Sequence, residues 1–433
     1  MGFFGRKRAP SVPHPRKEPR FDGPLTLERL EQIFQDCVDF TKRPVSLGEG
    51  GACTLTLCYL SGMVKMERVS DYVLRPLAQD EALARCGTPR QAMDRMKDGA
   101  LYNLSAEERT RLDAAVFDLV NGCCLLLFPG ESSVLSLNVG TEEKRSISSP
   151  SNETVLKGSR DAFVESLRTN TSIVRRHLKT PELRIREQVV GRQSVTSVDI
   201  LYIEGLTNPH LVEQVAAQLA DIDIDAVLAT GNIEEYIVPA ARTAFPLVQY
   251  TERSDRFCAG LAEGRVGILI DGLPLGYLAP GVLGDFLQAP QDKSESWLLA
   301  SALTLLRYLC MLGTLLLPAL YVAMVTFHQE MIPTRLALSI IAAKQDVPFR
   351  SVFEVIVLLL AFEILQEAGL RLPQSIGQTV SIIGGLVVGS AAVEAKIISP
   401  AVLIVVAIAG IAGYTMPSQE VAGALRIWRF LLA

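Results

Sequence analysis

Two glutamates inside one apolar stretch are the residues of this chain best suited to chemistry. Glu363 and Glu367 lie within residues 352–368, which are otherwise mostly apolar. An ionised side chain at bilayer depth costs about 2.5–3.5 kcal/mol on insertion scales, so such a residue usually faces a bundle interior or a watery path. The two acids are four positions apart and share one helix face, whereas Glu354 faces the opposite way. The pattern predicts ion movement, or coupling to it.

The sequence leaves open what these acids do. A carboxylate pair attracts cations, and a symmetric oligomer would repeat it as a ring. Alternatively, Glu363 and Glu367 pair within the membrane with Arg371 or Arg335, or Glu367 reaches the interface. A proton-coupled secondary transporter could use the same carboxylates together with His328.

A second polar cluster, His328 and Glu330, directly precedes residues 331–333 (MIP). A histidine next to a carboxylate can titrate as a gate near neutral pH. Polar residues are also expected wherever a membrane span ends. Both interpretations stay open.

Small residues recur at steps of four in the next apolar segment: Gly377, Ser381, Gly385 and Gly389. Such a stripe lets two helix backbones approach closely. It predicts close helix packing, either within the chain or between copies in an oligomer.

The motifs of common enzymes and cofactor sites are missing from the sequence. It contains no GxSxG, HExxH, Walker lysine loop or GxGxxG, and only four histidines. Residues 221–232 resemble the start of a calcium loop, but Ala226 stands where glycine is needed and Asn232 where glutamate is needed. The sequence therefore predicts no enzyme, no metal and no cofactor.

Composition changes along the chain. From residue 308 onward the seven Lys/Arg balance seven Asp/Glu, so the net charge of −5 belongs to the first part. That charge and the lack of a basic, aromatic-interleaved patch argue against a nucleic-acid partner. The basic, Pro-rich residues 1–24 predict a disordered tail, and no apolar stretch of a signal peptide follows them.

The predicted fold is an α/β soluble region of two subdomains followed by an all-α polytopic transmembrane domain. Alternating apolar patterns and turn residues place the subdomains at 25–141 and 153–287. Helices are expected over residues 106–119 and 160–167, and strands over 183–190 and 195–203. Residues 288–307 are expected to form a linker and an interfacial helix, and 308–433 four or five membrane elements, of which 336–343 is too short to cross.

Several runs from residue 157 onward resemble the spore germination receptor A-subunit family (GerA). They occur in family order: residues 157–161 (KGSRD), 202–205 (YIEG), 263–266 (EGRV), 327–334 (FHQEMIPT), 362–373 (FEILQEAGLRLP) and 391–395 (AAVEA). The resemblance covers about residues 150–430. Within its first part, the side chains expected at subunit interfaces are Arg160, Asp161, Asn170, Arg175 and Arg176.

The resemblance implies an integral protein of the spore inner membrane that works in signal transduction with B and C partner subunits. A homo-oligomer of the A subunit would form a ligand-gated channel for monovalent cations, in contact with membrane lipid. The small nutrient would bind the B subunit. Family members usually continue with a further hydrophobic segment, so this chain is expected to be either truncated at Ala433 or a short member. A non-conducting assembly scaffold of the same family is an alternative.

Overall fold

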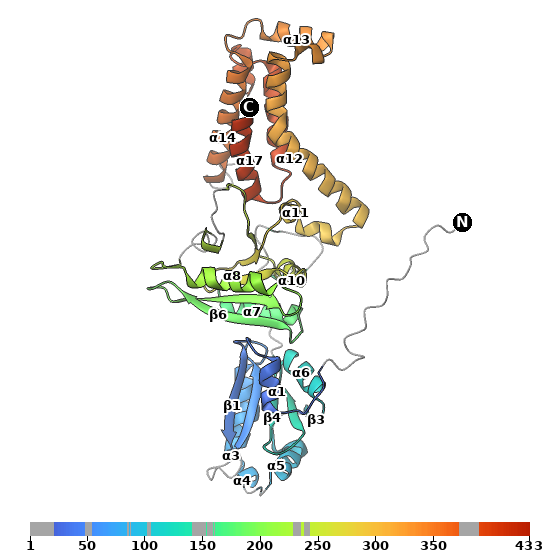
Figure 1. The fold of residues 1–433 in the computed structure, drawn as a ribbon, viewed down its shortest axis with the longest axis vertical. Coiled ribbons are helices and arrows are strands. Elements are labelled where there is room, and N and C mark those ends of the chain that lie inside the picture. The colour runs from blue at the N-terminus through green and yellow to red at the C-terminus, as the bar shows by residue number, and fades with distance from the viewer. Residues whose placement is uncertain are drawn as a thin grey trace, which may run out of the picture. The chain divides into compact units, whose positions relative to one another are not determined.

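The structure is a computed structural model. It describes residues 21–47, 54–84, 86, 88–101, 105–140, 153, 159, 161–227, 235–237, 243–371 and 389–433. The chain divides into two compact units (Figure 1). The first, the α/β unit, comprises Met1–Thr154, Ser159–Pro239 and Tyr250–Pro280. The second, the helical unit, comprises Val155–Gly158, Ala240–Gln249 and Gly281–Ala433.

The α/β unit begins with an antiparallel sheet in the order β1-β2-β4-β5-β3. Its strands are β1 (Phe40–Ser46), β2 (Thr54–Leu60), β3 (Ala106–Arg109), β4 (Cys123–Leu127) and β5 (Val134–Asn138). Successive side chains of a strand point to opposite faces. In β4, Leu126 accordingly joins one core cluster and Leu125 the other. One face is covered by α1 (Leu27–Ile33) and α6 (Leu112–Val120), and the other by helices including α5 (Pro89–Arg95).

One predicted helix in this half is wrong. The expected helix over residues 106–119 is strand β3 followed by α6. The cause is local: β3 (AEER) consists of residues that favour helices, but it pairs with β5 from Ala106 opposite Leu137 to Arg109 opposite Val134. Tertiary pairing overrides the propensity.

A second antiparallel sheet has the order β6-β7-β9-β10-β8. Its strands are β6 (Leu183–Val190), β7 (Thr196–Ile203), β8 (Gln249–Thr251), β9 (Val266–Ile270) and β10 (Gly276–Ala279), which confirms the two strands expected over 183–203. Helices α7 (Leu167–His177) and α10 (Ser254–Ala262) pack on the face that carries Ile185 and Leu201. On the other face, Gln188 of β6 donates to the carbonyl of Ala216 in α8 (Pro209–Ala220).

The expected helix over residues 160–167 is also wrong. Ala162 forms an isolated bridge with Arg253, and the N–H of Phe163 donates to the carbonyl of Glu252 at 2.8 Å. Helix α7 begins only at Leu167. Phe163 is an anchor of the core, in edge-to-face contact with Phe257, so tertiary packing determines the backbone here.

The two sheets are joined through the edge of β6. The residues between α1 and β1 lie along this edge, where the N–H of Val38 donates to Ile185 at 3.0 Å and the N–H of Ile185 donates to Asp36 at 3.1 Å. An uncovered edge strand is open to pairing with other chains. The residues between α1 and β1 cover this edge of β6 and so join both sheets into the single α/β unit.

The helical unit is built around one long helix, α12 (Trp297–Thr326), which continues through the expected boundary at residue 308. Among the residues that the structure describes, the other α-helices of this unit are α11 (Leu283–Leu287), α13 (Thr334–Lys344), α14 (Ser351–Arg371), α16 (Pro400–Gly413) and α17 (Gln419–Leu432). Helix α12 packs against α16 and α17, and α14 packs against α16. Within the described part of the chain, α12 is the helix long and apolar enough to cross a membrane.

Candidate functional site

The acids predicted to act together lie on α14, and the structure gives Glu363 two cationic partners. Its Oε1 is 2.8 Å from Arg426 Nη1, and its Oε2 is 3.4 Å from Arg429 Nη2. Both arginines belong to α17. The Glu363 side chain is 25% exposed, and those of Arg426 and Arg429 are 28% and 3% exposed. The site therefore holds one negative and two positive charges.

These partners differ from those proposed from the sequence, which were Arg371 and Arg335. Arg426 and Arg429 are three positions apart and so lie on the same side of α17. This spacing of two arginines within an apolar segment was the feature of the sequence that could have indicated the contact with Glu363. A single sequence does not show which helix packs against α14, and so it could not assign the pair.

Glu354 is held on the opposite side of α14, as the sequence predicts. It is buried, and its Oε2 accepts the backbone N–H of Ser399 at 2.8 Å, where α16 begins. Its Oε1 lies 3.4 Å from Lys344 Nζ, which also donates to the Ser351 hydroxyl. A carboxylate at a helix N-terminus is favoured by the orphan N–H groups there. Glu354 thus fastens α16 and the end of α13 to α14.

The remaining candidate acids are exposed. Glu367 lies one turn beyond Glu363 on α14. His328 Nδ1 is 3.7 Å from Glu330 Oε1 in the turn after α12, with side chains 60% and 77% exposed. An exposed pair at this distance contributes little free energy. The gating role of His328 and Glu330 stays a prediction.

Of the small-residue stripe, only Gly389 belongs to the described residues; Gly377, Ser381 and Gly385 lie outside them. Gly389 is buried, and a Cβ placed there would lie 3.5 Å from Leu403 of α16. This end of the stripe packs within the chain.

The side chains expected at subunit interfaces separate into two groups, with Arg160 outside the described residues. Asn170 and Arg175 are fully buried, so the structure places them inside the α/β unit and not on a surface. Asn170 bonds both backbone groups of Val164, and Arg175 forms a two-point ion pair with Asp39 at 2.8 and 2.9 Å. Asp161 and Arg176 are partly exposed, and for them the interface stays a prediction.

A serine, a histidine and an aspartate do meet in the α/β unit. Ser254 Oγ is 3.1 Å from His177 Nε2, and Asp161 Oδ2 is 3.8 Å from the same nitrogen. A catalytic triad needs the acid on the other ring nitrogen, Nδ1, so that the histidine can take the serine proton. These three residues therefore do not form a triad.

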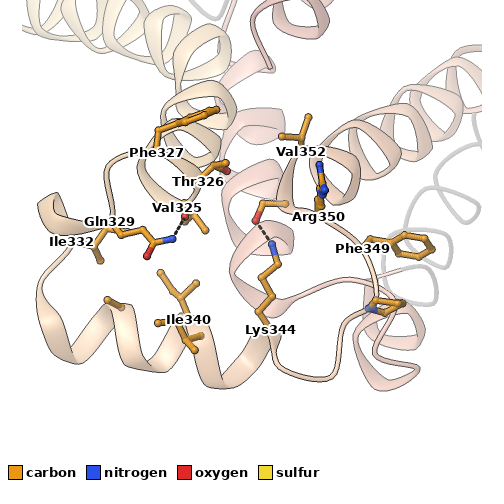
Figure 2. A pocket seen from close by; sticks show the side chains of 14 residues that line it. Val325, Thr326, Phe327, Gln329, Ile332, Ile340, Lys344, Phe349, Arg350 and Val352 are labelled. Atoms are coloured by element: carbon orange, nitrogen blue, oxygen red, sulfur yellow. Dashed lines mark hydrogen bonds between the residues drawn. The ribbon is translucent and has the colours of Figure 1, made fainter.

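A cavity of about 570 Å³ lies where α12 ends, α13 runs past and α14 begins (Figure 2). Lys344 extends into it toward the Ser351 hydroxyl, and Gln329 turns back to donate to Val325. Its walls are mainly apolar, including Ile340 and Phe349. The sequence alone gives no sign of this cavity, because it forms from three segments that become neighbours only in the fold.

Together these features define a class: a two-sheet α/β unit joined in sequence to an apolar helical unit whose acids are held by cations from other helices. The model of the Bacillus/Clostridium GerA spore germination protein family matches residues 28–433, and the chain belongs to that family. The resemblance inferred from the sequence is confirmed.

Individual proteins are similar to this chain over much of its length. The chain is 37% identical to the uncharacterized membrane protein YfkQ of Bacillus subtilis (strain 168), over 94% of this chain and 78% of the relative. It is also 37% identical to spore germination protein KA of the same organism, over 91% and 72%. A solved structure, the N-terminal domain of the A subunit of the Bacillus megaterium spore germinant receptor GerK3, covers 61% of this chain and 99% of its own at 27% identity, with a TM-score of 0.47.

Proposed function

We propose that this chain is the A subunit of a nutrient-responsive germination receptor of the spore inner membrane. Membership of the germination protein family supports the receptor role. We propose B and C subunits as its partners, with the nutrient bound by the B subunit. Copies of the A subunit would oligomerise around a gated path for monovalent cations.

The apolar surface of the helical unit supports the membrane location. Helix α12 is 30 residues long, about 45 Å, which exceeds the bilayer core of about 30 Å. Large apolar side chains of five helices are more than half exposed, among them Leu305, Leu338, Ile364, Ile411 and Leu431. Apolar surface of this extent marks a lipid or protein contact.

The observation that carries the cation path is the contact of Glu363 with Arg426 and Arg429. With both arginines in place the carboxylate is neutralised, and the excess positive charge repels cations. Moving α17 away from α14 would expose Glu363, with Glu367 one turn beyond. The nutrient must favour this open form by its own difference in affinity between the two states.

The two sides of the ion pair predict opposite effects on cation flow. In Glu363→Gln spores, nutrient-triggered K⁺ release should slow about tenfold or more, because the path loses its attraction for cations. In Arg426→Gln spores, K⁺ should leak before any nutrient is added, because the acid is less well held. A panel of amino acids, sugars and nucleosides would be added to the spores one at a time, and a K⁺ electrode would follow the release of K⁺. Asp346→Asn and Arg335→Gln, exposed charges of the same unit, are the matched controls.

A non-conducting scaffold is the second candidate, because both oxygens of Glu363 already have partners and the group can serve packing alone. A scaffold predicts the same direction of change for both substitutions, through reduced assembly. Equal loss of receptor from the membrane in both variants, with no leak, would favour the scaffold over the path.

A further inference from the structure

We propose that the cavity between α12, α13 and α14 binds the headgroup of an anionic phospholipid. The inference depends on the membrane location proposed above but not on cation flow. Nothing in the acid–arginine contact of α14 and α17 involves this cavity, whose lining lies within residues 325–352.

The charge of the lining selects for an anion. Lys344 and Arg350 both line the cavity, and no aspartate or glutamate does. Among the described residues, none forms an ion pair with Arg350. Ser351 and Val352, also in the lining, begin α14, so the positive end of a helix borders the same space. A phosphodiester suits these three features together.

The apolar part of the site indicates a lipid and not a free anion. Helix α13 has no buried residue in the protein, and Leu336, Leu338 and Ile341 are more than half exposed. Phe327, which also lines the cavity, is 73% exposed. A helix with a cationic side chain in its first and last turns, Arg335 and Lys344, and exposed apolar side chains between them suits the membrane interface. Acyl chains beside α13 would cover these side chains while the phosphate lies between Lys344 and Arg350.

Lys344 connects this site with the buried acid on α14. Its ammonium group donates to the Ser351 hydroxyl and lies 3.4 Å from Glu354 Oε1. Lysine has three N–H donors, so one remains for a phosphate oxygen. A bound headgroup would add a second anion to Lys344 and hold the turn between α13 and α14 in place.

The test measures lipid bound to the purified full chain. The protein would be exchanged into detergent micelles containing phosphatidylglycerol or phosphatidylcholine, and bound lipid counted by mass spectrometry. Wild type should retain phosphatidylglycerol in preference to phosphatidylcholine. Ala337→Phe fills the cavity without altering a charge and should weaken retention about tenfold. Ala343→Phe, the same change on α13 outside the lining, should leave retention unchanged.

Two further measurements test whether Arg350 supplies positive charge to the site and whether the bound phosphate belongs to a lipid or to a free anion. Arg350→Gln should weaken phosphatidylglycerol binding without disturbing the Lys344–Glu354 contact. Sodium phosphate or glycerol 3-phosphate at millimolar concentration should not displace the lipid. Equal retention of phosphatidylcholine, unchanged binding in Ala337→Phe, or full displacement by inorganic phosphate would each overturn the proposal. None of these measurements needs nutrient or ion flow, so a failed cation path would leave them interpretable.

Discussion

Two buried arginines, one in each unit, stand in opposite situations. Arg175 in the α/β unit and Asp39 are 1% and 2% exposed, and the guanidinium makes two bonds to the carboxylate. Arg429 in the helical unit is 3% exposed, but it shares Glu363 with Arg426 at the longer distance of 3.4 Å, and its Nε has no partner among the described residues.

The difference separates a fixed joint from a contact that can rearrange. Arg175 and Asp39 balance each other, so removing either leaves a buried charge alone. At Glu363 one acid serves two arginines, so either arginine can leave while the acid keeps a partner. The gate proposed above would use a contact of this kind, because its two states must differ by only a few kcal/mol. The fold places the rigid contact where the two sheets join and the redundant contact on the acid-bearing helix.

The largest effect is expected for Arg175→Met. It leaves Asp39 buried and unpaired, which costs about 3–5 kcal/mol. The α/β unit should therefore unfold at clearly lower urea concentration. The measurement is a urea titration of the full chain in detergent, read by hydrogen-exchange mass spectrometry on peptides from β1 and β6.

The neighbouring pair Asp36–Arg186 is the matched control. It also holds the segment between α1 and β1, but through β6 and not α7, at 3.0 Å, and its side chains are 43% and 31% exposed. Asp36→Asn should cost less than about 1 kcal/mol, because exposed pairs contribute little. Asparagine also tolerates the positive φ of 58° at this position. Equal losses in Arg175→Met and Asp36→Asn would show that burial is not the deciding factor.

Asp199, a buried acid of β7, provides an intermediate case. Burial raises the pKa of its carboxyl to about 6, although Arg168 and the Thr171 hydroxyl oppose the shift. The raised pKa means that the folded state holds this proton more tightly than the unfolded chain does. Its stabilising contribution is therefore present below the unfolded pKa of about 3.9 and is lost as pH rises through 6.

Asp199→Asn removes this pH dependence. Relative to wild type, the variant should gain about 2–3 kcal/mol between pH 4 and pH 7.5. Unfolding in urea at each pH, followed by a hydrogen-exchange pulse at one fixed pH, measures the difference on peptides from β7. A stability difference that does not change with pH would contradict the assignment.

The sequence predicts what depends on local pattern and misses what depends on partners. Alternation located β6 and β7, and apolar length located α12, α14 and α16 to within a few residues, apart from the early start of α12. Residues 106–109 failed because a helix-favouring run pairs with β5. Helical geometry correctly placed Glu354 opposite Glu363. The cationic side chains that contact these two acids are Lys344, Arg426 and Arg429. They lie on other helices, and the periodicity of a single sequence does not show which helices pack together.

The smallest effect, and the strictest test of the comparison, is expected for Arg429→Met. The same substitution that is costly at Arg175 should here change stability by less than about 1 kcal/mol, or raise it. Glu363 keeps Arg426 at 2.8 Å, while a desolvated guanidinium with an unpartnered Nε is removed. Thermal unfolding of the full chain in detergent, followed by fluorescence of Trp428 one position away, would measure it. A loss as large as that in Arg175→Met would mean that both arginines are needed, and that the contact on α14 is as fixed as the joint between the sheets.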